Sequence, residues 1–272
     1  MEWWQALILG LVEGLTEFLP VSSTGHLVVA QRLLGIGASE AANAYAIAIQ
    51  AGAIAAVLGL YRKRVSQICL GLIGKDADGT RLLVALVLGF LPAAVLGLAF
   101  DAKIERYLFG AWPVVAAWAG GGFVLLGLGP WLQSVRGGQP LEAIGPRVAI
   151  IVGFAQCAAL WPGVSRSLAT ILGGVAAGLS IVAAVEFSFL LGLLTLGAAT
   201  AYKALGSGQV MLETFGPLAI AIGFGAAWLS AVLSVRWMLS WLGRRGFDLF
   251  AYWRLAAAVI VAGLLLGKVI EY

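Results

Sequence analysis

The chain has 272 residues, of which 61% are hydrophobic and only 11% are charged. Soluble domains carry roughly 25% charged residues, so this composition excludes an ordinary soluble protein and indicates a bundle of membrane helices. The net charge of +4 is small and records membrane topology rather than nucleic-acid binding. Cys69 and Cys157 predict neither a disulfide framework nor a zinc site, and the N-terminal acid and tryptophan predict no cleavable signal peptide.

Taken in chain order, the apolar segments form a repeated pattern. Residues 1–35 are apolar but interrupted at Pro20, and three uninterrupted apolar segments follow. After a polar linker at 133–147, residues 148–180 are again interrupted, at Pro162, and three more uninterrupted segments follow. The six predicted membrane spans are residues 43–60, 82–100, 112–132, 184–202, 216–238 and 250–268.

This matching order predicts two repeats within a single membrane domain, about 1–135 and about 145–272. An overlay of the two interrupted segments places Ser165 on Ser23. Each half has three crossings, an odd number, so the second half is inverted if each interrupted segment enters and leaves on one side. The predicted fold is therefore an all-α integral membrane protein with two inverted-topology repeats, each containing one re-entrant helical hairpin and three transmembrane helices. Chance similarity among apolar helices is the alternative.

Basic residues indicate the orientation of these spans. Nine lie on the predicted side of the 61–81 loop and five lie on the opposite side. The nine are Arg62, Lys63, Arg64, Lys75, Arg81, Arg136, Arg147, Arg244 and Arg245, and the five are Arg32, Lys103, Arg106, Lys203 and Lys268. The positive-inside rule then places the 61–81 loop in the cytoplasm and both termini outside. Interrupted helices at matching positions of inverted repeats also indicate a site near the membrane midplane.

The first interrupted segment carries two acids, Glu13 and Glu17, four residues apart. On a helix this spacing places both carboxylates on one face. Neighbouring acids in apolar surroundings repel each other unless a cation joins them, and Mg²⁺ accepts carboxylate together with phosphate oxygens. We therefore favour a metal-binding or acid–base role over a polar helix face or a proton relay.

The residues after Pro20 predict a turn followed by a second half-helix. Ser22, Ser23 and Thr24 are suited to cap that helix, and free backbone N–H groups at a helix start can bind an anion. His26, the single histidine of the chain, is a candidate base for a serine nucleophile or a donor to phosphate. A packed polar residue is its structural alternative.

The second interrupted segment carries Arg166. An arginine at membrane depth needs an anionic partner, and either a phosphate or a glutamate of the first segment suits its planar fork. A permanent ion pair between the repeats is the structural alternative. Further polar residues inside apolar segments are second-tier candidates for the same cavity or for a supporting ion network: Gln50, Gln156, Glu186 and Arg254.

Two motifs carry a resemblance that covers essentially the whole chain. Glu-Gly-Leu-Thr-Glu-Phe-Leu-Pro-Val-Ser-Ser-Thr-Gly-His at 13–26 and Leu-Trp-Pro-Gly-Val-Ser-Arg-Ser at 160–167 resemble the undecaprenyl-pyrophosphate phosphatases linked to bacitracin resistance. The resemblance implies an enzyme of the bacterial plasma membrane that converts undecaprenyl pyrophosphate to undecaprenyl phosphate for peptidoglycan and envelope polymer synthesis. It also implies a divalent cation, Mg²⁺ or Ca²⁺, and a site open to the outer face; a homodimer is left open.

The resemblance also assigns roles to residues. Glu13 and Glu17 would serve in metal binding or acid–base chemistry, Ser23 would be the nucleophile with His26 assisting, and Arg166 would hold phosphate. The substrate-binding donors that it implies are Ser22, Thr24, Ser165, Ser167 and Thr170.

Other mechanisms and functions compete with this interpretation. A water molecule activated near the glutamates is an alternative to a phosphoserine intermediate. A polyprenyl-phosphate transporter or flippase would share the inverted-repeat fold. A lipid phosphatase of the acid-phosphatase superfamily needs two histidines, whereas this chain has one. A non-catalytic scaffold would leave the acids, the arginine and the histidine at membrane depth without a purpose.

Overall fold

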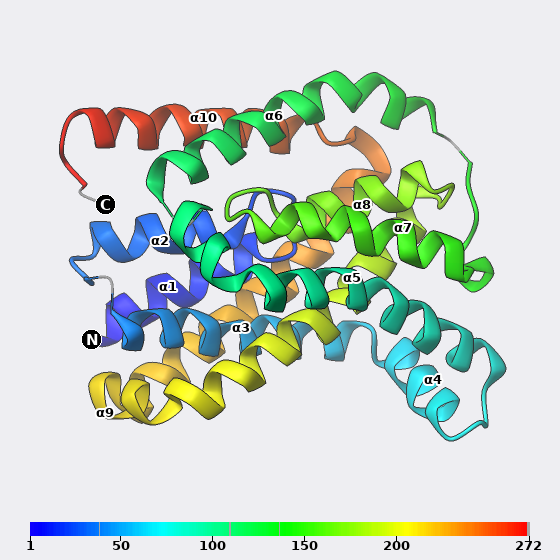
Figure 1. The fold of residues 1–272 in the computed structure, drawn as a ribbon, viewed down its shortest axis with the longest axis horizontal. Coiled ribbons are helices and arrows are strands. Elements are labelled where there is room, and N and C mark those ends of the chain that lie inside the picture. Colours follow the sequence, from blue (N-terminus) through cyan, green and yellow to red (C-terminus); the bar gives the residue numbers. More distant parts are fainter. Residues whose placement is uncertain (38, 109, 136, 271–272) are drawn as a thin grey trace.

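The structure is a computed structural model that describes residues 1–37, 39–108, 110–135 and 137–270. Arg136, one of the basic residues counted above, lies outside the described residues, as do the side chains of Lys203 and Arg244. The described elements are helices, shown in Figure 1: α1 (Trp3–Thr16), α2 (Ser23–Leu33), α3 (Glu40–Leu60), α4 (Arg62–Leu72), α5 (Ala77–Leu108), α6 (Ala111–Ser134), η1 (Leu141–Ala143), α7 (Pro146–Cys157), η2 (Ala158–Leu160), α8 (Arg166–Ala176), α9 (Ile181–Arg245) and α10 (Asp248–Leu266).

Six helical stretches in the described part of the chain are long and apolar enough to cross a membrane. They are Glu40–Leu60, Ala77–Ile104, Ala111–Leu132, Ile181–Gly206, Gly208–Leu242 and Asp248–Leu266. Each overlaps one of the six spans predicted from the sequence. Large apolar side chains on these helices, such as Leu98, Leu218 and Val259, are exposed, which is expected where lipid rather than water surrounds a protein. The chain is a multi-pass membrane protein.

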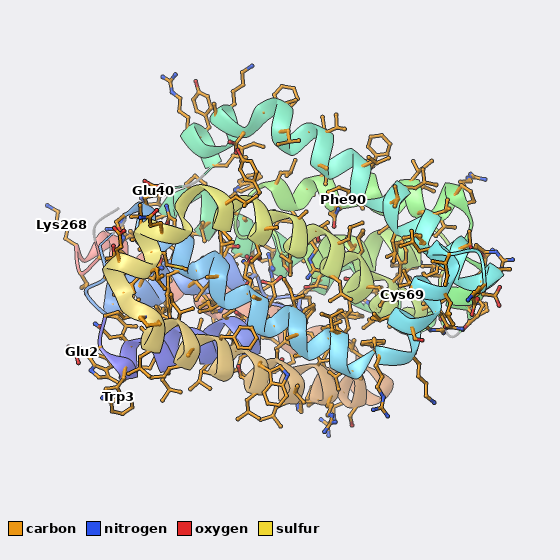
Figure 2. All side chains as sticks on the ribbon, turned by 90° about the horizontal axis from the view of Figure 1, so that it is seen from below. Glu2, Trp3, Glu40, Cys69, Phe90 and Lys268 are labelled. Atoms are coloured by element: carbon orange, nitrogen blue, oxygen red, sulfur yellow. The ribbon has the colours of Figure 1, made fainter. Side chains whose placement is uncertain are left out.

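Helix α9 contains the fourth and fifth of these stretches. Gly216 interrupts it with φ 75° and ψ 160°, a conformation that glycine adopts without a steric penalty, and Pro217 begins the second arm. In Figure 2 the two arms extend from the bend toward the other end of the bundle, with α3 running between them. In Figure 2, Glu2, Trp3, Glu40 and Lys268 lie at one end of the bundle and Cys69 lies at the other.

The two interrupted segments form two pairs of short helices. In Figure 1, α1 and α2 lie toward the end of the bundle that holds both termini, whereas α7 and α8 lie toward the other end. The turn of the first pair contacts the second pair directly, since the Ser167 hydroxyl donates to the Leu19 carbonyl at 2.9 Å. This contact brings residues about 150 positions apart in sequence into one site.

Two regions that the sequence presents as loops are structured. The loop after the first span contains α4. The polar linker at 133–147 is tied to the turn between α8 and α9, because the Gln139 N–H donates to the Gly178 carbonyl at 2.8 Å. Leu141 and Ile144 of the linker are buried in the core. The average polarity of the segment does not predict this contact with the core, because two apolar residues are enough to make it.

Candidate active site

Ser22 and Ser165 give the two turns the same backbone geometry. Ser22 precedes α2 with φ 72° and ψ 99°, and Ser165 precedes α8 with φ 76° and ψ 115°. Non-glycine residues rarely adopt positive φ, and such strain gathers at functional sites where the surroundings fix it. The structure thus pairs Ser165 with Ser22, so the sequence overlay of Ser165 on Ser23 is wrong by one residue.

The side chains of these two serines differ in their contacts. The Ser165 hydroxyl caps α8 by accepting from the Leu168 N–H at 3.3 Å. Ser22 occupies the equivalent position of α2, but its side chain makes no capping hydrogen bond. The expectation that Ser22 caps α2 through its hydroxyl is therefore wrong. Ser22 instead lines the cavity described below.

Glu17 links the two halves of the chain. One of its carboxylate oxygens accepts a hydrogen bond from the Ser23 hydroxyl, and the other accepts from Arg166 Nη2 at 3.2 Å. Arg166 Nη1 donates to the Ser188 carbonyl at 2.7 Å, and the guanidinium lies 5.6 Å from the Phe18 ring centroid. The structure therefore brings the predicted acid, hydroxyl and arginine into contact, with Glu17 and Ser23 both buried.

Glu13 lies one helical turn before Glu17 and is fully buried. No described group donates a hydrogen bond to either of its carboxylate oxygens. An isolated buried carboxylate is unfavourable, so it needs either a proton or a cation. Two carboxylates on one helix face fit Mg²⁺, which takes its other ligands from phosphate and water. They do not form a complete protein site, because the described residues contain no group of three or more acidic, histidine or cysteine ligands.

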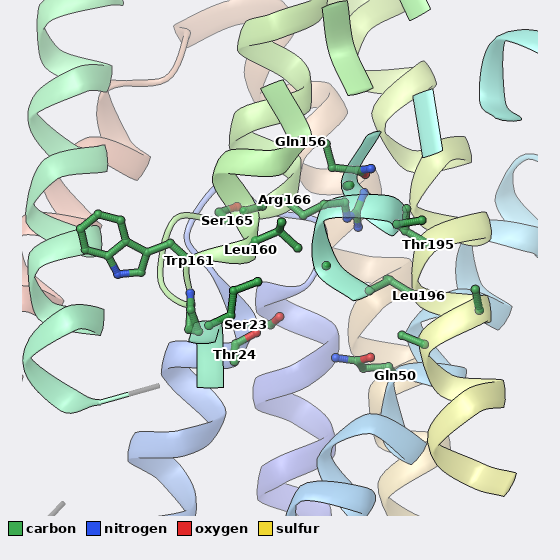
Figure 3. Close-up of a pocket in the computed structure, with 18 of the residues that line it drawn as sticks. Ser23, Thr24, Gln50, Gln156, Leu160, Trp161, Ser165, Arg166, Thr195 and Leu196 are labelled. Carbon is green, nitrogen blue, oxygen red and sulfur yellow. The ribbon is translucent and has the colours of Figure 1, made fainter. Parts of the chain in front are cut away.

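A cavity of about 620 Å³ lies beside these residues (Figure 3). Eight predicted site residues line it: Glu17, Ser22, Ser23, Thr24, Gln50, Gln156, Ser165 and Arg166. Much of the remaining wall is apolar and comes from α5 and α9, with Phe90, Leu98 and Leu196 among its residues. A polar region against a long apolar wall is suited to an amphiphile with an anionic head and a hydrocarbon tail.

His26 lies behind the first turn and is not among the residues that line this cavity. Its Nδ1 is 2.7 Å from the Ser22 carbonyl oxygen, and its Nε2 accepts from the Trp253 indole N–H at 2.9 Å. Its ring centroid is 4.8 Å from that of Trp118. The carboxylate of Glu17, rather than the imidazole, accepts the hydrogen bond from the Ser23 hydroxyl.

Comparison with known proteins identifies the family. The chain matches the family described as bacitracin resistance protein BacA over residues 6–260. The chain belongs to the BacA family. It is 44% identical over 97% of its length to the undecaprenyl-diphosphatase of Sorangium cellulosum, of which 87% is covered. It is 42% identical over 94% of its length to undecaprenyl-diphosphatase 2 of Rhodospirillum rubrum, with 93% covered, and 43% identical over 94% to the undecaprenyl-diphosphatase of Ectopseudomonas mendocina, with 92% covered. The resemblance drawn from the two motifs is confirmed.

Two further predicted donors of this BacA-family protein bind protein groups. Ser167 donates to the Leu19 carbonyl and lies 2.9 Å from the Ser165 hydroxyl oxygen. The Thr170 hydroxyl lies 2.8 Å from the Arg166 carbonyl and 2.7 Å from the Ser188 hydroxyl. Both side chains are almost completely buried and do not line the cavity. They stabilise the second turn around Arg166.

Glu186 belongs to a separate cluster at the α4 end of the bundle. It accepts from Arg64 Nε at 2.8 Å, and Arg64 also forms an ion pair with Glu142 of η1. The hydrogen bond from Arg64 holds the pKa of the exposed Glu142 carboxyl below its ordinary value. Glu186 therefore takes the structural role that the sequence left open for it.

Arg254, the other second-tier cation, is fully buried. It donates to the carbonyls of Pro20 at 3.2 Å, Ala117 at 2.8 Å and Gly163 at 2.9 Å. The sequence marked Arg254 as unusual but offered no partner, because a backbone carbonyl has no sequence signature. It also gave no signal for Trp253, the partner of His26.

Proposed function

We propose that this protein hydrolyses undecaprenyl pyrophosphate to undecaprenyl phosphate and inorganic phosphate, and so returns the lipid carrier to peptidoglycan and envelope polymer synthesis. The observation that carries the proposal is Glu17, which joins the Ser23 hydroxyl to Arg166 at the polar part of a largely apolar cavity. The names of the relatives support the same activity.

We infer that the protein lies in the bacterial plasma membrane as two inverted repeats. The pairs α1–α2 and α7–α8 would be the re-entrant hairpins. Their positions toward opposite ends of the bundle in Figure 1 support this arrangement, as does the shared backbone geometry of Ser22 and Ser165. The basic residues favour a cytoplasmic position for the α4 end. Both termini and the opening of the site would then face outward.

In the proposed reaction, the lipid tail lies along the apolar wall and the pyrophosphate lies between the starts of α2 and α8. Arg166 suits a phosphate ligand because its Nε is buried without a partner in the described chain, and its planar fork matches phosphate oxygens. Backbone N–H groups at the two helix starts add to the anion site. These positively polarised groups stabilise the charge on the transferring phosphoryl.

Ser23 is the proposed nucleophile. Its oxygen forms a bond to the terminal phosphorus while its proton passes to Glu17, and the bond from that phosphorus to the bridging oxygen breaks, leaving undecaprenyl phosphate. Water then hydrolyses the phosphoserine, which releases phosphate and restores the hydroxyl. The hydrogen bond from Ser23 to Glu17 supports this route over direct attack by water, since it aligns the base with the nucleophile.

A divalent cation, Mg²⁺ or Ca²⁺, is part of the proposal. Glu13, with Glu17 one turn away, would hold it, and the unpartnered carboxylate of Glu13 supports this assignment. The cation would neutralise charge on the pyrophosphate oxygens, the contribution that metals make in phosphoryl transfer generally.

The test is phosphate release by purified protein in detergent, with undecaprenyl pyrophosphate as substrate and without any gradient. We expect one phosphate per lipid, strong inhibition by EDTA, and loss of turnover in Ser23→Ala but not in Ser134→Ala. Ser134 is a suitable control because its hydroxyl binds the carbonyl of Trp131 at an exposed helix end. If the wild type binds the lipid and moves it between vesicle leaflets without releasing phosphate, the transporter alternative replaces this proposal.

A further inference from the structure

Two adjacent residues of α10 contact the elements that carry the candidate site, although neither lines the cavity: Trp253 donates to His26 of α2, and Arg254 donates to both turns. We propose that they are positioning residues for the reaction, and that Trp253 acts through His26. On this proposal, His26 holds the backbone of Ser22 and does not accept the proton of the nucleophile. The inference rests on the proposed phosphatase function and adds a role for a helix outside the cavity.

The two hydrogen bonds of His26 determine its tautomer. An indole N–H can only donate, so His26 Nε2 must be the acceptor of the 2.9 Å bond from Trp253. The proton of the neutral ring then lies on Nδ1, 2.7 Å from the Ser22 carbonyl, to which it donates. Trp253 also lies nearly parallel to the imidazole, with 13° between the ring planes, and Trp118 contacts the same ring. These contacts leave neither ring nitrogen free to serve as a base.

The partner of His26 Nδ1 is the carbonyl of a strained residue, Ser22. A residue with φ 72° that is not glycine is held in place only by its surroundings. The hydrogen bond from His26 fixes the carbonyl of this residue, which belongs to the peptide group that joins Ser22 to Ser23. Loss of the bond would let the turn relax and move the hydroxyl of Ser23 away from Glu17. A displacement of about 1 Å is enough to slow an oriented reaction by ~100-fold.

Arg254 contacts equivalent positions of both turns. Pro20 lies two residues before Ser22, and Gly163 lies two residues before Ser165. One guanidinium donates to both of these carbonyls. A planar fork with fixed donor directions sets the distance between two acceptors, which a lysine ammonium cannot do.

The surroundings of Arg254 also fit a positioning role. The described partners of the side chain are carbonyl oxygens rather than a carboxylate, so the charge is buried at a cost that packing alone does not explain. Gly121 makes room for it, because a β-carbon at that position would overlap the guanidinium. We infer that this arrangement keeps the two turns in register, with Ser23 and Arg166 on opposite sides of the phosphate.

Asparagine and glutamine at position 26 separate the two roles of the imidazole. Asparagine places an amide N–H near the position of Nδ1, whereas glutamine reaches only the position of Nε2. We expect His26→Asn to keep kcat within about 5-fold of the wild type and His26→Gln to lose ~100-fold, the scale of a misaligned group. If His26→Asn is as inactive as His26→Gln while both bind the substrate, the histidine is a proton-transfer residue and the proposal is wrong.

Trp253→Phe removes only the indole N–H and keeps an aromatic ring beside His26. We expect kcat to fall ~3- to 10-fold, the scale of one lost hydrogen bond, with KM within 2-fold. The effect should disappear when Trp253→Phe is added to His26→Asn, because the bonded nitrogen is then absent. Tyr252→Phe, at the exposed neighbouring position, is the control. If Trp253→Phe lowers kcat by the same factor in the His26→Asn background as in the wild type, Trp253 acts by packing alone and the proposal is wrong.

Arg254→Lys and Arg254→Met complete the experiment. Both should lower kcat by more than ~10-fold, while KM changes by less than 3-fold. Methionine donates no hydrogen bond, and the ammonium of lysine lacks the planar fork that sets the distance between the two carbonyls. A loss confined to KM would place Arg254 at the substrate and contradict the positioning role. If a variant of Arg254 fails to fold, the comparison of the His26 and Trp253 variants still decides the proposal. Wild-type protein measured alongside distinguishes failure of the proposed function from failure of the positioning role. If the wild type releases no phosphate, the proposed function is rejected; if only the variants behave unexpectedly, the positioning role is rejected.

Discussion

Ser22 and Ser165 share a left-handed backbone conformation, with φ 72° and φ 76°, yet only Ser165 caps its helix through its hydroxyl. This difference gives a stability prediction. Ser165→Ala should lower the stability by ~1 kcal/mol through loss of the cap, whereas Ser22→Ala should be nearly neutral. Ser22→Gly should be more stable than Ser22→Ala by ~1 kcal/mol, because glycine adopts positive φ without strain. Thermal unfolding in detergent measures all three, and equal losses for the two alanine variants would contradict the structure.

Glu13 should show opposite effects on stability and activity. Its carboxylate is buried without a described hydrogen-bond donor, so Glu13→Gln should raise the melting temperature in the absence of divalent cations. The same change should lower turnover by ~100-fold, the scale of a lost catalytic ligand or base, and raise the Mg²⁺ concentration needed for half-maximal activity. Glu213→Gln, at an exposed position of α9, is the control. Unchanged Mg²⁺ dependence would remove Glu13 from the metal site.

Glu17→Gln should fail in a different way. Glu17 accepts from Ser23 with one oxygen and from Arg166 with the other, so glutamine removes the base and leaves one carbonyl oxygen in place of two acceptors. We expect turnover to fall by ~100-fold or more and excess Mg²⁺ to restore none of it. Recovery at high Mg²⁺, measured by phosphate release, would show that Glu17 serves only as a metal ligand.

Much of the fold and of the site could be predicted because the signals are local. A membrane span is a run of about 20 apolar residues, so six spans follow from hydropathy alone. Polar and ionisable residues within such runs stand out for the same reason, and Glu17, Ser23 and Arg166 are among them. The sequence predicts either a phosphate or a glutamate of the first segment as the partner of Arg166, and the structure shows the ion pair with Glu17.

The remainder depends on contacts that leave no mark in the sequence. The overlay of the two turns is wrong by one residue because Pro162 lies three residues before Ser165, whereas Pro20 lies two residues before Ser22. Trp253 was missed because tryptophan is common in membrane proteins and its partner is 227 residues away. Arg254 had no assigned partner because it binds carbonyl oxygens, which every residue carries.

Arg166 should be sensitive to the loss of its fork. Arg166→Lys keeps a positive charge but replaces the separate Nη1, Nη2 and Nε donors, two of which bind the Ser188 carbonyl and Glu17, with a single nitrogen that has no planar fork for phosphate. We expect kcat/KM to fall by ~100-fold or more, and Arg166→Ala to be essentially inactive, the scale of removing a preorganised donor to the transition state. Arg81→Lys, whose parent side chain pairs with Asp78 at the exposed surface, should remain close to wild type. Substantial activity in Arg166→Ala would show that phosphate binds elsewhere.

The orientation in the membrane can be measured with single cysteines. In a chain lacking Cys69 and Cys157, a membrane-impermeant thiol reagent should fail to label Ser66→Cys in intact cells, because α4 carries the basic residues that favour the cytoplasm. Gln209→Cys, at an exposed position near the bend of α9, should be labelled. Ser66→Cys should react once the cells are permeabilised, which shows that the thiol itself is accessible. The reverse pattern would place both termini in the cytoplasm and turn the opening of the proposed site to the inner face.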